Sequence, residues 1–462
     1  MRMGAFWGNV PTVIKTIQTK FGDGINAGMP SFSIKDSELT NAVNVKTDDY
    51  PAITTRDART SYSSGLGTTD INAFGQRNNT QLHVATSNTW KYWSSTSWVD
   101  ITTTLSNSPG KFIDFAVGTN LYTLYFNSTQ MYGWSGTSTR FVLTNAPATD
   151  KVATHKGRIY AVGSKVLYYS ALNKSTDWTT ADDAGNITVT NSKGDLTAIK
   201  EYADHIITWS EYSMHELYGT GPTNYTLVDI SNNIGCVSDR SVQEVKGRLF
   251  WLDYEGVYQY TGGEPKKISQ KVDSFIKNIN WTYKTKISAG TYGDKYYLSI
   301  PYSSSATDNN LILVYDVYRD VWVTETGAFD SFVTVGNNLY GMDTTGGIYN
   351  MVNGDPTSDV SWSFETKPFY MGDKITVQQM HNVYKGSTSA DMTLSYTTSA
   401  SSTTYNSLIS SSKFTMNNSE QRTQFRLPTT DISKEDWYKL KVSGHGKVTY
   451  YALEETKRIR RG

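Results

Sequence analysis

One motif recurs along this chain at a regular spacing, and this repeat limits the fold more than any other feature. KGRIY begins at Lys156 and KGRLF at Lys246, 90 residues further on. Weaker versions place seven copies near residues 82, 121, 159, 206, 249, 296 and 339. Each copy has an apolar strand, a turn of Gly, Asn or Asp, and a second strand ending in aromatic residues. We expect KGRIY and KGRLF to be the first strands of alternate blades. A period of about 40–45 residues with several strands per unit is typical of β-propeller blades.

The composition supports the same fold class. The chain of 462 residues has 32 Tyr, 12 Trp and 16 Phe, and Gly, Ser, Thr and Asn are abundant. Aromatic and β-branched residues favour strands, whereas Gly, Asn and Ser favour turns. We therefore expect an all-β protein whose centre is a β-propeller of about seven blades, with five to eight open because the first and last copies are the least regular. Most of the repeated Tyr and Trp residues are expected to pack between blades.

Two segments lie outside the repeat and complete the expected domain organisation. Residues 1–70 read as an N-terminal arm and platform segment, with a short helix led by Asp36 and a strand up to Arg56. Residues 71–355 form the propeller. Residues 356–462 show five or six alternating strands, which predicts a small β-sandwich with a basic tail.

Charge and cysteine content narrow the classes of function. The 43 Lys and Arg residues balance 43 Asp and Glu residues, so the formal net charge is zero and a free-standing nucleic-acid binder is disfavoured. The one cysteine, Cys236, allows neither an intramolecular disulfide nor a cysteine-based zinc site. The N-terminus lacks the apolar core of a signal peptide, and no apolar run reaches bilayer length. We expect a soluble protein made without a secretion signal.

No catalytic motif stands out in the sequence. The six histidines have no metal-site spacing, and His215-Glu216 is not followed by the second histidine of a metalloprotease motif. His83 and His205 lie at equivalent places in the repeat, which indicates a shared packing role. Asp48-Asp49 and Asp182-Asp183 are better explained as solvated turns than as cation sites. We therefore predict no enzyme activity, no catalytic residues, no metal and no cofactor.

The order of the parts resembles that of bacteriophage tail hub and nozzle proteins. FGDGIN (21–26), SIKDSELTNAVNV (33–45) and PAITTR (51–56) are similar to the N-terminal pattern of those families, which the propeller follows. GRIYAVGSKVLYYSALNKSTDW (157–178) resembles their recurrent strand pair. The segment from IGCVSDRS to EPKKIS (234–269) resembles the next part of the pattern, Gly-x-x-Ser, then Trp-Leu, Gly-Val-Tyr and Ile-Ser. The chain lacks the long inserted domains of the large nozzles of short-tailed phages.

The resemblance implies a mechanical function. It predicts a structural protein of a phage tail or neck, assembled in the host cytoplasm into the virion, where it forms a homo-oligomeric ring, expected to be a hexamer, around the DNA channel. The ring would retain packaged DNA and take part in its ejection. Its expected partners are portal, adaptor or other tail proteins, and DNA that passes without sequence-specific contacts; no membrane partner is expected. The neutral net charge suits a channel through which DNA must slide.

The segments outside the repeat supply the candidate docking residues. Clustered arginines form bidentate bonds to carboxylates or phosphates, so the basic end KRIRRG is either a solvated tail or a docking contact. The candidates in the N-terminal segment and the tail are Asp36, Glu38, Asn44, Arg56, Lys457, Arg458, Arg460 and Arg461. The alternative function is a receptor-binding or carbohydrate-binding propeller, in which rim Trp and Tyr residues stack on sugars.

Overall fold

The computed structural model describes residues 13–63, 66, 71–137, 139–352, 354, 359–370, 375–399, 402–426 and 437–459, with backbone alone for 375–378 and 459. The chain forms two compact units. One contains residues 1–58, 319–326 and 354–462, and the other contains residues 59–318 and 327–353. The sequence-based division differs from this at the N-terminus, because residues up to 58 group with the C-terminal strands.

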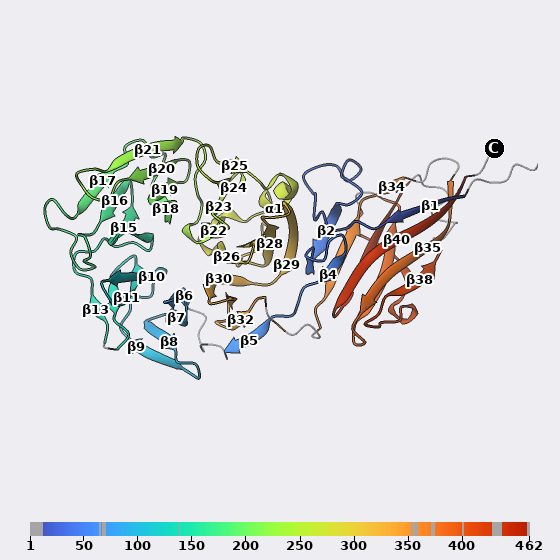
Figure 1. Cartoon of the computed structure of the whole chain (residues 1–462), viewed down its shortest axis with the longest axis horizontal. Helices are drawn as coiled ribbons and strands as arrows, with labels where there is room; N and C mark the ends of the chain where they lie inside the picture. Colours follow the sequence, from blue (N-terminus) through green and yellow to red (C-terminus); the bar gives the residue numbers. More distant parts are fainter. Residues whose placement is uncertain are drawn as a thin grey trace, which may run out of the picture. The chain divides into compact units, whose positions relative to one another are not determined.

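The larger unit is a ring of seven antiparallel sheets, the left-hand part of Figure 1. The fold is therefore all-β with a seven-bladed propeller, as predicted. The first three sheets are β6 (Ile71–Arg77), β7 (Gln81–Thr86), β8 (Thr89–Trp93) and β9 (Trp98–Thr102); β10 (Gly110–Val117), β11 (Asn120–Asn127), β12 (Tyr132–Trp134) and β13 (Phe141–Val142); and β14 (Val152–His155), β15 (Arg158–Gly163), β16 (Val166–Tyr169) and β17 (Gly185–Thr188).

The other four sheets continue in chain order. They are β18 (Leu196–Tyr202), β19 (His205–Ser210), β20 (Met214–Tyr218) and β21 (Thr226–Ser231); β22 (Gln243–Val245), β23 (Arg248–Asp253), β24 (Gly256–Tyr260) and β25 (Lys266–Lys267); β26 (Ser288–Tyr292), β27 (Lys295–Ile300) and β28 (Leu311–Asp316); and β30 (Phe329–Val335), β31 (Asn338–Asp343), β32 (Ile348–Asn350) and β5 (Thr60–Ser63). One short helix, α1 (Asp273–Ile276), follows the fifth sheet.

The seven repeat copies fall on the second strand of each sheet, not the first. They correspond to β7, β11, β15, β19, β23, β27 and β31, and the aromatic-rich runs that follow them are the third strands. The expectation that KGRIY and KGRLF are first strands was therefore wrong, although they do belong to alternate blades. The true first strands were missed because several are short and carry no repeated aromatic pattern, such as Val152–His155 and Gln243–Val245.

The Lys-Gly pair in these copies is a two-residue hairpin turn. His155 pairs with Arg158 across one turn, and Val245 pairs with Arg248 across the other. In the first turn Lys156 and Gly157 have φ of 45° and 74°. The second turn has φ of 50° and 71° at the equivalent positions. Positive φ at both central residues suits the right-handed twist of the flanking strands, and glycine adopts it without strain.

A strand from the N-terminal side closes the ring. Strand β5 pairs with β32, so the last sheet takes its outer strand from a part of the chain that precedes the first sheet. The interface between the last and first sheets is apolar. Its buried residues include Leu82 and Val84 of the first sheet and Tyr340, Met342 and Ile348 of the last. This closure joins the last sheet to the first, so that each covers an apolar face of the other.

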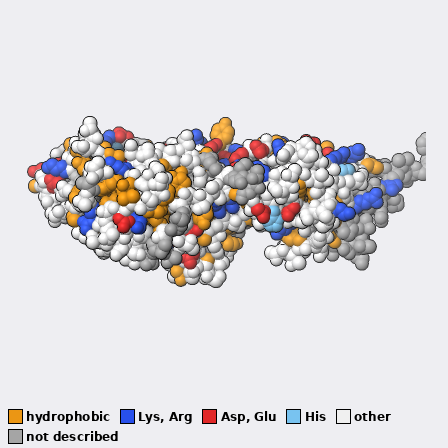
Figure 2. Space-filling model, turned by 90° about the horizontal axis from the view of Figure 1, so that it is seen from below, with side chains coloured by type: hydrophobic (Ala, Val, Ile, Leu, Met, Phe, Trp, Pro, Cys, Tyr) orange, Lys and Arg blue, Asp and Glu red, His pale blue; other side chains and the backbone are white. Residues whose placement is uncertain are grey.

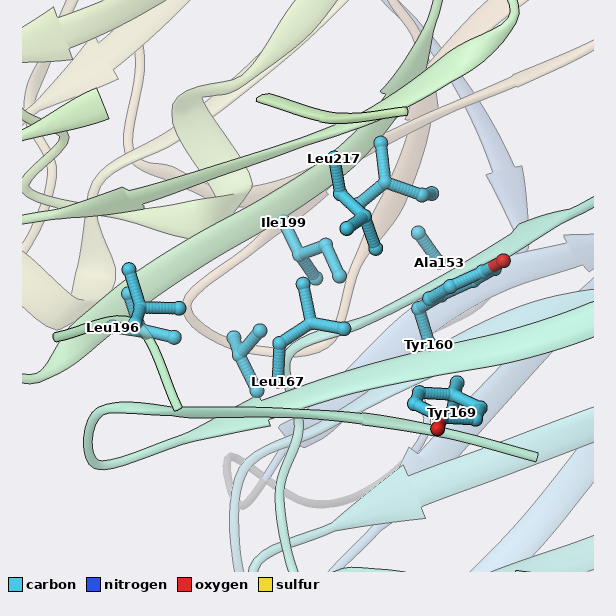
Figure 3. Close-up of a cluster of buried hydrophobic side chains, with 10 residues drawn as sticks. Ala153, Tyr160, Leu167, Tyr169, Leu196, Ile199 and Leu217 are labelled. Carbon is cyan, nitrogen blue, oxygen red and sulfur yellow. The ribbon is translucent and has the colours of Figure 1, made fainter. Parts of the chain in front are cut away.

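Neighbouring sheets bury apolar side chains against one another. Figure 3 shows one such cluster, in which Tyr160 and Leu167 of the third sheet meet Ile199 and Leu217 of the fourth. Burial of a large apolar side chain stabilises the fold by roughly 1.5–3 kcal/mol. The expectation that the repeated aromatic residues pack between blades is confirmed for Tyr160, which is 1% exposed.

The smaller unit is a β-sandwich, as predicted for the C-terminal region. One sheet contains β1 (Val13–Gln18), β3 (Val45–Lys46), β4 (Ile53–Thr55), β35 (Ile375–Gly386), β38 (Gln421–Phe425) and β40 (Val448–Ile459). The other contains β2 (Leu39–Val43), β29 (Val321–Thr326), β33 (Trp362–Thr366), β34 (Phe369–Tyr370), β36 (Asp391–Thr397), β37 (Asn406–Ile409) and β39 (Trp437–His445). Between the sheets, Phe364 and Tyr450 have ring centroids 5.2 Å apart, and Phe21 packs on both.

The predicted helix after Asp36 does not form. Leu39–Val43 is strand β2, which pairs antiparallel with β33 and parallel with β29. Leu39 and Ala42 are buried on this strand, and Asn44 then bends the chain with φ of 57°. The tertiary pairing outweighs the weak local preference of a segment rich in Thr, Asn and Val, which are poor helix formers.

Candidate functional site

The axis of the propeller contains a cavity of about 440 Å³. Its walls come from the inner strands of six of the seven sheets or from residues next to them, and the third sheet contributes Asp150, which lies just before β14. The lining includes residues 73–76 of β6, 110–113 of β10, 199 and 200 of β18, 239–243 before and within β22, 288–291 of β26, and 331–334 of β30. Because every sheet points its first strand towards the axis, residues far apart in sequence meet here.

A short 3₁₀ turn, Asp239–Ser241, connects opposite walls of this cavity. The Lys111 ammonium of the second sheet lies 2.6 Å from Asp239 Oδ2. Arg240 Nη2 donates to the carbonyl oxygen of Asn72, in the first sheet, at 3.3 Å. These two contacts join residues separated by 128 and 168 positions. The turn therefore cross-links the ring through its centre.

Further hydrogen bonds fix the turn in place. The backbone N–H of Ile199 donates to Asp239 Oδ1 at 3.0 Å. The Tyr296 hydroxyl donates to the Ser241 carbonyl at 2.8 Å, and the Ser238 hydroxyl donates to the Ile287 carbonyl at 2.8 Å. Both side chains and backbone of the turn are thus held by the fourth and sixth sheets.

The segment before the turn needs a glycine because it runs close to other backbone. A Cβ on Gly235 would lie 2.2 Å from the backbone of Glu211. The Gly235 N–H donates to Asp253 Oδ2 at 2.9 Å, and its carbonyl accepts from Trp251 Nε1 at 2.7 Å. Cys236 is fully buried, and burial raises the pKa of its thiol above the usual range. It is therefore a packing residue and not a reactive thiol.

The cavity has an excess of cationic groups. Lys111, Lys200 and Arg240 line it together with two carboxylates, Asp150 and Asp239. Both carboxylates are paired, Asp239 with Lys111 and Asp150 with Lys151 at 2.8 Å. Burial, and then the neighbouring Lys111 charge, lower the pKa of Lys200. The arrangement can attract an anion; it offers no nucleophile with an adjacent base.

A serine–histidine–aspartate constellation lies elsewhere in the fourth sheet. Ser213 Oγ is 2.9 Å from His215 Nε2, and His215 Nδ1 is 2.8 Å from Asp229 Oδ1. Those distances match a catalytic relay. Ser213 is 0% exposed, however, and its oxygen accepts from the Lys193 N–H at 3.1 Å and bonds to the Ser210 hydroxyl at 2.7 Å. A substrate has no access to this oxygen, so the set serves as a buried structural network.

Two of the docking candidates are occupied within the sandwich unit. The Asp36 carboxylate forms a salt bridge of 2.6 Å with Lys367 but stays largely exposed. Glu38 is buried, and its Oε2 accepts from Asn26 Nδ2 at 2.9 Å and from the Lys35 N–H at 3.0 Å. Asp36 thus lies on the surface, whereas Glu38 stabilises the turn that precedes β2.

Asn44 and Arg56 form one buried polar network. Asn44 Oδ1 accepts from Arg56 Nε at 2.9 Å and from the Thr326 N–H at 3.0 Å. Arg56 Nε also lies 3.6 Å from the Glu325 carboxylate. The network ties the N-terminal segment to strand β29, 282 positions away in sequence. Both residues therefore have a structural role inside their unit.

The basic tail is partly a strand. Lys457 and Arg458 belong to β40, opposite Ile14 and Val13 of β1. Lys457 forms a salt bridge of 2.9 Å with Glu455, whereas Arg458 is exposed. Arg460 and Arg461 lie outside the described residues. The tail residues and the N-terminal candidates thus share one unit, but the axial cavity belongs to the other.

The sequence did not single out Lys111, Lys200, Asp239 and Arg240. The one available signal was the short polar run SDRS, which interrupts two apolar segments. His83 and His205 are both buried, as a packing role requires, but they do not lie at equivalent places: His205 is the first residue of β19 after its hairpin turn, where β7 begins with Gln81. His83 is 0% exposed and accepts from Trp90 Nε1 at 2.9 Å, and burial lowers its pKa to about 3. His205 stacks on Tyr218 with ring centroids 4.6 Å apart.

Comparisons with known proteins add similarity of fold alone. No protein-family model matches the chain, and no curated protein matches it. A streptogramin B lyase structure is 8% identical, with 63% of this chain and 96% of that chain covered and a TM-score of 0.44. The extracellular domain of a hybrid two-component system from B. thetaiotaomicron is 11% identical over 70% and 45% of the two chains, with a TM-score of 0.46. BamB from Moraxella catarrhalis is 10% identical over 61% and 84%, with a TM-score of 0.41.

Two further observations concern the described part of the chain. It holds no cluster of three or more His, Cys, Asp or Glu side chains arranged to bind a metal ion. None of its helices combines the length and apolarity needed to cross a bilayer.

Proposed function

We propose that this chain is a structural protein of a phage tail or neck, of the hub or nozzle type. In this role several copies, expected to be six, form a ring around the DNA channel, which retains packaged DNA and opens during ejection. In this function the chain maintains the ring and changes its contacts with neighbouring subunits when the ring opens, and it catalyses no reaction.

One observation carries the proposal: the residues that underlie the resemblance hold the architecture together. Asn44 and Arg56, from the N-terminal pattern, fasten that segment to strand β29. Asp239 and Arg240, from the later pattern, cross-link the propeller through its axis. In a structural virion protein, the characteristic sequence motifs are expected to contain residues that stabilise the fold. In an enzyme family, they are expected to contain catalytic residues in a cleft.

The charge distribution is compatible with this role. Basic and acidic side chains are interspersed over much of the face in Figure 2, in line with the zero net charge. A strongly basic wall would hold DNA through many phosphate contacts, each of which releases counterions. A mixed surface lets DNA slide past.

The test is the oligomeric state of the purified full-length chain. Mass photometry and negative-stain electron microscopy should reveal closed rings, either directly or on addition of the tail or neck proteins encoded with it. A chain that stays monomeric under all of these conditions contradicts the proposal.

The basic tail can be tested separately as a docking element. A triple variant, Arg458→Glu with Arg460→Glu and Arg461→Glu, reverses three charges and leaves the Lys457–Glu455 pair in β40 intact. We expect it to lower incorporation into particles at least tenfold. The matched control is Lys20→Glu with Lys35→Glu and Lys413→Glu, which reverses three exposed charges elsewhere in the same unit. Normal incorporation of the triple variant would refute docking through the tail.

A glycan-binding function is the second candidate, because a groove on the propeller has suitable walls. This hollow, of about 630 Å³, lies between the first and second sheets. Tyr92, Tyr122 and Trp134 line it, together with the amide side chains of Asn78 and Asn120. Aromatic faces stack on sugar rings, and amides bond to hydroxyl groups.

The stacked pair of aromatic rings in this groove also has a packing role. Tyr92 and Trp134 have ring centroids 5.1 Å apart, and the Arg77 guanidinium lies 5.4 Å from the Trp134 ring. Glycan-array binding by the wild type that Tyr122→Ala abolishes would favour this second function. Binding that persists in the variant, or no binding at all, would count against it.

A further inference from the structure

Lys200 places a cationic group in the axial cavity that the surrounding protein does not neutralise by direct contact. It lies on β18, the inner strand of the fourth sheet, and lines the cavity. Among the described residues, no oxygen accepts a hydrogen bond from its ammonium and no carboxylate forms a salt bridge with it. The carboxylates of Asp239, Glu244 and Glu201 act on it only through longer-range attraction.

Arg240 provides a second cation with unused donors. Its guanidinium makes one hydrogen bond, from Nη2 to the Asn72 carbonyl at 3.3 Å. A guanidinium has five N–H donors in a planar fork, so four remain for other acceptors. Within the described chain, no carboxylate lies at salt-bridge distance from Arg240, although Asp330 acts on it from further away.

The other charges at the cavity are already in use. Lys111 neutralises Asp239 at 2.6 Å, and Asp239 also accepts the Ile199 N–H. Asp150 is held by Lys151 at 2.8 Å. The Lys111–Asp239 and Asp150–Lys151 pairs therefore neutralise both carboxylates of the lining. The charges of Lys200 and Arg240 face the same cavity, and among the described residues neither has a carboxylate in contact. Lys200 and Arg240 are both partly buried. A cation withdrawn from water without a counter-charge is destabilising, so an anion that enters the cavity gains favourable electrostatic contacts with both groups.

The cavity has a size suited to a small ligand. At about 440 Å³ it falls within the range of small-molecule sites. Gln76, Thr291 and Thr334, from the first, sixth and seventh sheets, add polar residues to the lining. Lysine supplies a point charge and arginine a planar fork, and this combination suits tetrahedral or planar oxyanions.

We propose that the axial cavity of the propeller binds a small oxyanion, a phosphate or carboxylate group, held by Lys200 and Arg240. The bound anion neutralises the two cations and joins the fourth sheet to the turn that precedes β22 of the fifth. This inference is independent of the virion role, because it concerns a ligand inside a single propeller.

The experiment measures thermal stability of the full-length protein against added anion. Inorganic phosphate and malonate are titrated from 0.1 to roughly 20 mM at constant ionic strength, with chloride as the reference salt. A ligand that binds only the folded state raises stability as RT ln(1 + [L]/Kd), which is about 2.7 kcal/mol at one hundred times Kd. We expect a saturable rise in Tm with at least one of the two anions, and the two arms distinguish phosphate from carboxylate ligands.

Variants locate the site. Lys200→Met should weaken the anion affinity at least tenfold and should raise Tm in the absence of anion, because a partly buried charge without a counter-charge in contact is removed. Lys165→Met is the matched control, since Lys165 is exposed and outside the cavity; it should leave both quantities unchanged. Arg240→Lys keeps the charge but loses the planar fork, so it should weaken binding while the far-ultraviolet circular dichroism spectrum stays that of the wild type.

Three outcomes would overturn the proposal. The first is a Tm response to phosphate and malonate that is no larger than the response to chloride. The second is a saturable response that Lys200→Met and Arg240→Lys leave unchanged, which would place the anion elsewhere. The third is a Lys200→Met protein with normal anion affinity and lowered Tm, which would make Lys200 a structural residue. If Lys200→Met does not fold, the Arg240→Lys titration decides alone.

Discussion

The two Lys-Gly-Arg copies give a matched pair for testing how the blades are joined. Arg158, in the first copy, is 4% exposed. Its Nε donates to the Thr220 carbonyl of the fourth sheet at 3.0 Å, and Nη1 donates to the Ser170 carbonyl at 2.8 Å. Nη2 bonds to Asp183 Oδ1 at 2.7 Å. Arg248, at the same place in the second copy, is exposed. The perturbation is Arg158→Ala, with Arg248→Ala as its control.

The expected loss follows from these contacts. Removing one partner of a buried ion pair costs about 3–5 kcal/mol. The Asp183 side chain is 34% exposed, so water screens it after the change and the lower end applies. The Ser170 carbonyl stays buried without this donor, which costs about 1 kcal/mol more. We expect Arg158→Ala to lose about 3–4 kcal/mol and Arg248→Ala to lose less than about 0.5 kcal/mol.

Urea and thermal unfolding measure this difference. For a unit of this size, about 2 °C of Tm per kcal/mol predicts a decrease of roughly 6–8 °C for Arg158→Ala. Intrinsic tryptophan fluorescence follows both units, because the sandwich also contains Trp322, Trp362 and Trp437, so the transition that differs between the two variants is assigned to the propeller. If the two alanine variants lose equal stability, within about 0.5 kcal/mol, then Arg158 does not join the third and fourth sheets and the argument fails.

The remaining predictions concern three buried polar groups. Burial raises the pKa of Asp330 to about 6, and its Oδ1 has no hydrogen-bond partner. The folded state therefore holds the Asp330 proton more tightly than the unfolded state does. The stability that this proton contributes is lost as pH rises from about 4 to about 6. Asp330→Asn should remove this loss, so that above pH 6 the variant is more stable to urea than the wild type, by up to about 3 kcal/mol of unfolding free energy. If the unfolding free energy of the variant changes between pH 4 and 7 as much as that of the wild type, the prediction is wrong. Ser213 should not react with a fluorophosphonate probe, and stoichiometric labelling detected by mass spectrometry would show that its oxygen is accessible. Asn44→Ala should cost about 2–4 kcal/mol in urea unfolding of the sandwich, because Arg56 and Thr326 lose an acceptor and the positive φ loses a tolerant residue; a loss below about 1 kcal/mol would show that the network contributes little.

The repeat predicted the propeller because its signal comes from the most regular strands. The second and third strands of each sheet carry the buried aliphatic and aromatic residues, such as Tyr160 and Leu167, that pack between blades. The first strands were assigned wrongly because they face the axis, where polar residues such as Lys200 replace apolar ones. The strand after Asp36 was taken for a helix because its partners, β29 and β33, lie about 280 or more positions further along the chain.

The axial site depends on ring closure and could not be read from local patterns. Lys111, Lys200 and Arg240 come from three sheets, and nothing in their immediate neighbours marks them out. Their proximity follows only once all sheets point their first strands at one axis. Asp36 and Arg458 could be chosen as docking candidates from the sequence because they lie in segments outside the repeat. Even there, the burial of Glu38 and Asn44 required the tertiary pairing of the sandwich.

The virion role is tested most directly by locating the chain in particles. A short peptide tag inserted between the exposed residues Thr403 and Thr404, detected with gold-labelled antibody by electron microscopy of purified phage particles, reports its position. We expect label on the tail axis at or below the head, in several copies per particle. Purified particles without the chain, or label only at the tips of fibres together with glycan binding by the isolated protein, would contradict it.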